Sequence, residues 1–172
     1  METQTFYTTV GSISFTLLGL WWVVVMGREA WQINLARRRM AYAISLHFAL
    51  PGAMSILSVI APDVGLLWRV SFVSASALGL IGAIYVVRTL REDHDCPRLV
   101  RAIELIAIPV YGLILAVALA PGLVTGLGLG LTALQVEAIV VSILVFFGVQ
   151  AARILMIEPL RTDIPPAEFP PG

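Results

Sequence analysis

Residues 6–27 read FYTTVGSISFTLLGLWWVVVMG, a stretch that has no charged side chain and ends directly before Arg28. About 20 apolar residues of helix cross the hydrocarbon core of a bilayer, so this block predicts a transmembrane helix. Four more apolar blocks with few charges follow, at residues 40–61, 66–87, 102–120 and 134–157. The sequence therefore predicts an all-α fold, a polytopic bundle of five membrane-spanning helices.

The composition supports this fold class. Of the 172 residues, 59% are hydrophobic and 13% are charged, which is too little polar surface for a soluble globular domain. The connections between the blocks are too short to fold separately, so we expect residues 1–158 to form one transmembrane domain. Residues 159–172 contain five prolines, which favour an extended chain, and we expect a proline-rich tail there.

The distribution of arginine predicts the orientation of the bundle. All eleven basic residues are arginine, and ten of them flank the connections that share one side of the membrane. Arg69 alone falls on the other side. By the positive-inside rule the arginine-rich side is cytoplasmic, which places the N-terminus outside and the C-terminal tail in the cytoplasm. We expect a multi-pass protein of the cell membrane, either an inner or a plasma membrane.

Arg37, Arg38 and Arg39 form a basic triplet directly before the second apolar block. Arginines near a membrane surface attract anionic lipid by about 1 kcal/mol per charge. The triplet is therefore a candidate contact for anionic lipid. The alternative is that it acts as a topology signal only.

Small side chains recur in the third block. Ser71, Ala75, Gly79 and Ala83 are spaced by four residues, so they share one face of a helix. Small residues let another helix backbone approach closely. This face predicts helix packing, either in the centre of the bundle or at an interface between subunits.

Three ionisable side chains within the blocks are functional candidates, because charge is costly in lipid: His47, Glu104 and Glu137. His47 shares an arc of its helix with Ser55 and Ser58, an arrangement suited to a hydrated path for an ion or solute. The alternative is polar packing, in which His47 forms a hydrogen bond across the bundle and the serines bond to their own helix.

Glu104 is followed on its helix face by Tyr111, and Pro109 between them removes one helical hydrogen bond. A carboxylate, a tyrosine and a proline in this arrangement are suited to a kinked gate or a proton-coupled site. A salt bridge between Glu104 and Arg101 at the membrane surface is the simpler expectation.

Glu137 enters the fifth block from the side opposite most arginines. Because pairing reduces the cost of both charges, we expect Glu137 to pair with Arg69. If Glu137 instead faced a lumen, it would attract cations at an outer mouth.

The sequence carries no clear catalytic, cofactor or metal motif. Residues 92–96 include metal-compatible side chains, but successive residues cannot all converge on one ion, and Cys96 is the single cysteine. Two histidines at different levels do not suit a bis-histidine haem, and no nucleophile motif is present. We therefore expect no enzyme activity, no cofactor, no metal and no nucleic-acid partner.

Two functions remain. The first is a non-enzymatic membrane protein that acts through helix packing, as a homo-oligomer or a small subunit of a membrane complex, with lipids and other membrane chains as its partners. The alternative is a small ion or solute channel or transporter, with a path near His47, Glu104 and Glu137. A membrane enzyme acting on lipid or quinone beside His47 and Tyr85 is disfavoured, because no catalytic constellation accompanies them.

Overall fold

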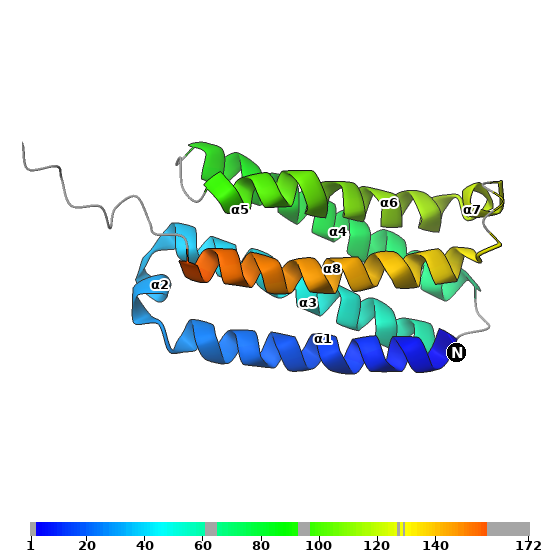
Figure 1. The fold of residues 1–172 in the computed structure, drawn as a ribbon, viewed down its shortest axis with the longest axis horizontal. Helices are drawn as coiled ribbons and strands as arrows, with labels where there is room; N and C mark the ends of the chain where they lie inside the picture. Colours follow the sequence, from blue (N-terminus) through cyan, green and yellow to red (C-terminus); the bar gives the residue numbers. More distant parts are fainter. Residues whose placement is uncertain (1–2, 61–64, 93–96, 127, 129, 158–172) are drawn as a thin grey trace, which may run out of the picture.

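The computed structural model describes residues 3–60, 65–92, 97–126, 128 and 130–157 (Figure 1). The expected proline-rich tail lies outside this part of the chain, as do residues 93–96 of the segment 92–96 that carries metal-compatible side chains. The described elements are α1 (Thr3–Met26), α2 (Glu29–Ile33), α3 (Leu35–Ile60), α4 (Gly65–Glu92), α5 (Pro97–Ala102), the π-helical turn η1 (Ile103–Ala107), α6 (Ile108–Leu119), α7 (Gly122–Gly126) and α8 (Ala133–Ile157).

Within the described part of the chain, five helical segments are long and apolar enough to cross a membrane, which confirms the expected spans. They are α1, α3, the Gly65–Arg91 part of α4, the continuous run Pro97–Leu119, and α8. α3 begins at Leu35, before the apolar block that starts at residue 40. Hydropathy marks only the residues within hydrocarbon, whereas helical hydrogen bonding continues through the interface. The chain is a multi-pass membrane protein.

The fourth span widens locally next to its proline. Pro109 has no backbone N–H, and its ring crowds the carbonyl of Leu105, four residues earlier. Here the backbone N–H of Ile108 donates to the carbonyl oxygen of Ile103, five residues earlier, which is the π-helical pattern of η1. The span therefore accommodates the proline by a π turn and continues as α6.

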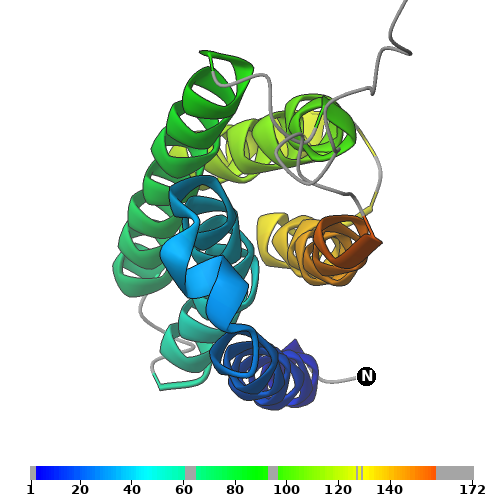
Figure 2. The same ribbon diagram turned by 90° about the vertical axis from the view of Figure 1, so that its left-hand side faces the viewer.

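The helix α3 is the centre of the bundle. It packs against α1, α4 and α8, while α4 also packs against α6, and α6 against α8. Figure 2 shows this arrangement end-on, with α3 between α1 and α4. Buried residues make up 61% of an apolar 18-residue stretch of α3 but only 22% of such a stretch in α1. The helix α1 is therefore the most exposed span.

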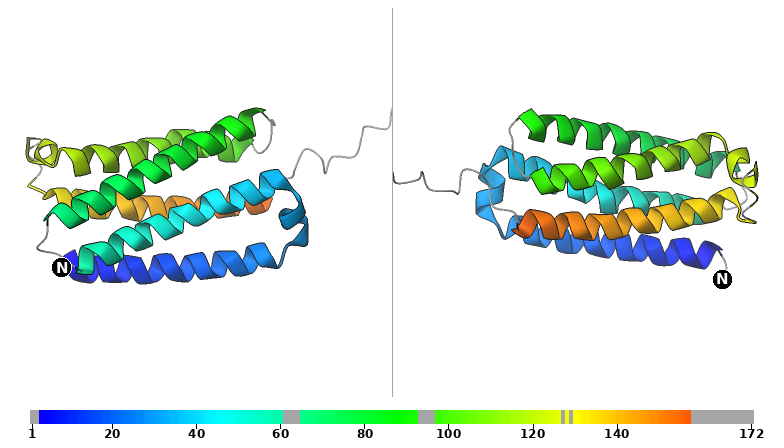
Figure 3. Two further views of the ribbon diagram at one scale, coloured as in Figure 1. Left: turned by 180° about the vertical axis from the view of Figure 1, so that it is seen from behind. Right: turned by 45° about the horizontal axis from the view of Figure 1, so that its top comes forward.

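The helices alternate in direction, so the arginines gather at one end (Figures 1 and 3). α1, α4 and α8 finish at this end, and α3 and α5 begin there. We call it the arginine-rich end; its described arginines are Arg28, Arg37, Arg38, Arg39, Arg88, Arg91, Arg98, Arg101 and Arg153. Arg69 lies near the opposite end, in the second turn of α4.

Candidate functional site

His47 lies near the middle of α3, twelve residues after Leu35, or about 18 Å along the helix. Its side chain is buried, and Nδ1 lies 2.7 Å from the carbonyl oxygen of Ala43 in the same helix. Because a carbonyl only accepts, Nδ1 carries the hydrogen, and Nε2 is left as an acceptor. Nε2 has no hydrogen-bond partner among the described residues. Among the described residues, His47 therefore forms no hydrogen bond across the bundle, in contrast to the polar packing suggested by the sequence. Its donor nitrogen bonds to Ala43 in its own helix, and its acceptor nitrogen has no partner in the described part of the chain.

The ring of His47 faces α6 and α8. Its centroid lies 5.7 Å from that of Tyr111 and 5.1 Å from that of Phe147. The hydroxyl of Tyr111 is also buried without a partner in the described part of the chain. Two unused polar atoms, one an acceptor and one a donor, therefore lie within the same aromatic cluster.

The small face of α4 makes room for this cluster. A Cβ atom added to Gly79 would lie 2.2 Å from Cε1 of Tyr111, so the tyrosine ring occupies the space of the missing side chain. Ser71 and Ala83 are buried on the same helix, and Ala75 is half-buried. At Gly79, the small face lies against α6 inside the bundle.

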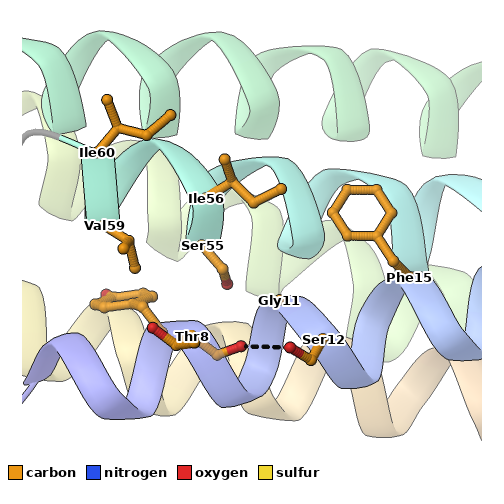
Figure 4. Close-up of a pocket in the computed structure, with 9 residues that line it drawn as sticks. Thr8, Gly11, Ser12, Phe15, Ser55, Ile56, Val59 and Ile60 are labelled. Atoms are coloured by element: carbon orange, nitrogen blue, oxygen red, sulfur yellow. Dashed lines mark hydrogen bonds between the residues drawn. The ribbon is translucent and has the colours of Figure 1, made fainter.

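Ser55 and Ser58 lie apart from the ring cluster of His47. Ser58 donates to the carbonyl oxygen of Met54, 2.9 Å away, as expected of a serine bonded to its own helix. Ser55 faces α1, where it lines a groove of about 250 Å³ with Gly11 and Phe15 (Figure 4). The structure thus directs Ser55 towards α1, while His47 is directed towards α6 and α8.

Glu137 is completely buried, and neither carboxylate oxygen has a hydrogen-bond partner among the described residues. One turn earlier in α8, the carbonyl of Leu134 accepts a hydrogen bond of 2.9 Å from the hydroxyl of Tyr7. Glu137 therefore lies on the buried face of α8, near the end of the bundle opposite the arginine-rich end.

The expected pairing of Glu137 with Arg69 is wrong. Nε of Arg69 donates to the carbonyl of Ala118 at 3.1 Å, and its Nη2 donates to that of Leu119 at 3.0 Å. These carbonyls belong to the last turn of α6, where helical acceptors lack partners and a positive charge is favoured. Arg69 thus caps a neighbouring helix.

Glu104 forms a salt bridge, as expected. Its partner is Arg91 of α4, so the expected pairing with Arg101 is wrong. Nη2 of Arg91 lies 2.6 Å from Oε1 of Glu104. Both side chains are partly exposed, so the pair contributes little stability. The pair lies at the arginine-rich end, so Glu104 is not part of the cluster around His47.

The basic triplet divides into different environments. Arg37 is buried, and its Nη1 donates to the carbonyl of Leu155 in α8. Its guanidinium also lies 5.6 Å from the ring centroid of Trp31, the buried residue of α2. Arg38 is exposed and Arg39 is half-buried. Arg38 and Arg39 therefore remain available to anionic lipid, whereas Arg37 joins α3 to α8.

Sequence reasoning missed a row of small residues on the outer face of α1. Thr5, Thr9, Ser12, Thr16 and Gly19 alternate in spacings of four and three, and all are exposed. We call this row the hydroxyl seam. Three of its hydroxyls donate to carbonyls one turn earlier, at 2.8 to 3.0 Å. The alternation of four-residue and three-residue spacings is the sequence signal that would have identified this seam.

The described residues contain no group of three or more metal-ligating side chains. Comparison with known protein families, with characterised proteins and with solved structures found no match. The function is therefore inferred from the geometry of the bundle.

Proposed function

We propose that this protein acts through association of its transmembrane helices, as a homo-oligomer in which the hydroxyl seam of α1 forms the contact. The observation that carries this proposal is the exposure of the seam. The opposite face of α1 packs into the bundle through a second row at similar spacing, Tyr7, Gly11, Ser14, Trp21 and Val25. The helix α1 therefore has two faces suited to packing, and only one of them is used within the chain.

The depth of the seam argues against contact with water alone. Thr16 is thirteen residues from the start of α1 at Thr3, which is about 20 Å along the helix. This distance reaches past the middle of a hydrocarbon core about 30 Å thick. Headgroup water can solvate Thr5, but Thr16 and Gly19 lie at depths where the neighbours are acyl chains or other helices.

The shape of the seam favours another helix. Small residues allow two backbones to approach, and serine and threonine add interhelical hydrogen bonds of about 0.6 kcal/mol each. Alternating spacings of three and four residues suit a crossing angle of about 20°. A Cβ atom added to Gly19 would find nothing within 4 Å, so this surface is open in the single chain.

A second copy is the partner that the seam fits. The seam has no charged residue, so a two-fold arrangement can place it against itself without repulsion. A different membrane chain with a similar face is the alternative occupant, and it would make this protein a subunit of a complex.

Cross-linking in native membranes tests the proposal. In a Cys96→Ser background, single cysteines replace Ser12 or Thr16, and Ile81 of α4 serves as an exposed control position. We expect oxidation to give dimers from the two α1 cysteines and few from Ile81→Cys. Equal yields at all three positions would contradict a contact through α1, and a cross-link to another protein would identify a complex.

Transport is a second candidate, favoured by the unpartnered polar atoms inside the bundle. The described residues with such atoms include Glu137, His47, Tyr111, Ser14 and Ser55. Leaving buried polar groups unsatisfied is costly, and water or a transported cation would satisfy them. These groups lie at different depths on four helices, which suits a path more than a single binding site.

Flux measurements separate transport from association alone. Proteoliposomes containing a pH-sensitive dye are exposed to a proton gradient, with Glu137→Gln as the test variant and Glu104→Gln as its control. Transport predicts flux that Glu137→Gln abolishes and Glu104→Gln retains. Absence of flux in the unaltered protein over a range of pH and potential would exclude proton transport by this path.

A further inference from the structure

A cleft of about 210 Å³ lies between the start of α5 and the last turns of α8. It is lined by Arg98 from α5 and by Gln150, Arg153, Ile154 and Ile157 from α8. The four residues of α8 recur at spacings of three, one and three, so they form one face of that helix. The cleft opens at the arginine-rich end and combines polar donors with an apolar wall.

The charge on the described lining of the cleft is positive. Among the described residues, both charged side chains that line it are arginines, and none is acidic. Arg153 is exposed and has no ion pair or hydrogen bond among the described residues. Arg98 makes another contact, but a guanidinium has five N–H donors and can bind a further acceptor. The cleft is therefore suited to an anion.

The depth of the cleft indicates the kind of anion. Gln150 precedes Ile157 by seven residues, or about 10 Å of helix, so the cleft extends from the helix end into the span. A phosphate alone would leave Ile154 and Ile157 without an apolar partner. A purely apolar ligand would remove the arginines from water without compensation. A ligand with both parts satisfies the two sides of the cleft.

We propose that this cleft binds the headgroup of an anionic phospholipid. The guanidiniums of Arg98 and Arg153 donate to its phosphate oxygens, a pairing favoured by their planar arrangement of donors. The amide of Gln150 reaches the ester region, and the isoleucines contact the upper acyl chain. Basic pockets between transmembrane helices are known to bind anionic headgroups. This site is independent of the hydroxyl seam, which lies on α1.

The test measures lipid retention by the full-length protein, purified in mild detergent from an equal mixture of phosphatidylglycerol and phosphatidylcholine. We expect the unaltered protein to retain phosphatidylglycerol preferentially. Arg153→Gln should lower this preference about fivefold, the effect of one arginine near a membrane surface. Arg88→Gln removes an exposed arginine of α4 at the same end but outside the cleft, and it should leave the preference nearly unchanged.

Three results would overturn the proposal. Equal losses in Arg153→Gln and Arg88→Gln would indicate general surface attraction. An equal thermal stabilisation by inorganic phosphate and by phosphatidylglycerol, with the protein in phosphatidylcholine nanodiscs, would assign the cleft to a soluble anion. If Arg153→Gln fails to fold in those nanodiscs, Arg153→Lys provides the test. It keeps the charge without the planar guanidinium, so it should show a partial loss of preference, and full retention would overturn the proposal.

Discussion

Tyr111 reaches the centre of the bundle because position 79 has no side chain. The ring fills the space beside α4 so closely that even a methyl group at Gly79 would overlap it. The same pattern recurs where Gly148 of α8 meets Phe48 of α3, at 2.8 Å from an added Cβ. Single glycines thus set the distances between helices at the level of His47.

Gly79→Leu should destabilise the protein by at least the 1–3 kcal/mol that overpacking of a core typically costs. The physical reason is the overlap with Cε1 of Tyr111. Thermal unfolding in detergent is the measurement, and Gly112→Ala is the control, because an added Cβ there meets nothing within 4 Å. Equal melting temperatures for the two variants would show that the α4–α6 contact is not as described.

His47→Leu should change stability by no more than about 0.5 kcal/mol, in contrast to a residue that bridges two helices. Leucine loses the bond to Ala43, which lies within α3, and also removes the unpartnered Nε2. His47→Gln should fold equally well. Unfolding measured for both variants checks this, and a loss of more than about 1 kcal/mol only in His47→Leu would indicate a hidden partner for Nε2.

At the scale of helices, hydropathy predicted the spans but not which polar groups meet. The length of an apolar block follows directly from bilayer thickness, so all five spans were predictable. The partner of Arg69 was not predictable, because every residue has a backbone carbonyl and the sequence does not show which carbonyls at the end of α6 lie near Arg69. Arg37 likewise binds a carbonyl, that of Leu155. The hydroxyl seam could have been predicted from its spacing.

Arg69 and Glu137 should act independently in a double-mutant cycle. Arg69→Gln should cost about 1–2 kcal/mol through the lost cap on α6, because a charged donor to one part-buried and one exposed carbonyl is removed. The effect of Glu137→Gln should add to it within about 0.5 kcal/mol. Unfolding of both single variants and the double variant measures the coupling, and a coupling above 1 kcal/mol would restore the ion pair expected from the sequence.

At the scale of the whole molecule, the bundle has a marked charge asymmetry. Nine described arginines lie at one end and Arg69 near the other, which follows from the alternating directions of the helices. The membrane orientation remains a prediction of the positive-inside rule. The cleft proposed to bind an anionic lipid also lies at the arginine-rich end, which that rule assigns to the cytoplasmic side.

Reporter fusions should find the connection between α3 and α4 outside and the C-terminal tail in the cytoplasm. A reporter active only in the cytoplasm is fused after Gly172 or after Pro62. We expect activity from the first fusion and none from the second, because arginines are retained on the cytoplasmic side. The reverse pattern would show that the bundle is inverted.

The mass of the purified particle in mild detergent tests association most directly. One chain has a mass of 18.6 kDa. After correction for bound detergent and lipid, we predict a multiple of this mass for the unaltered protein and a single-chain mass for Gly19→Leu, whose added side chain separates the hydroxyl seams. An unaltered protein with the mass of one chain and no co-purifying partner would contradict the account.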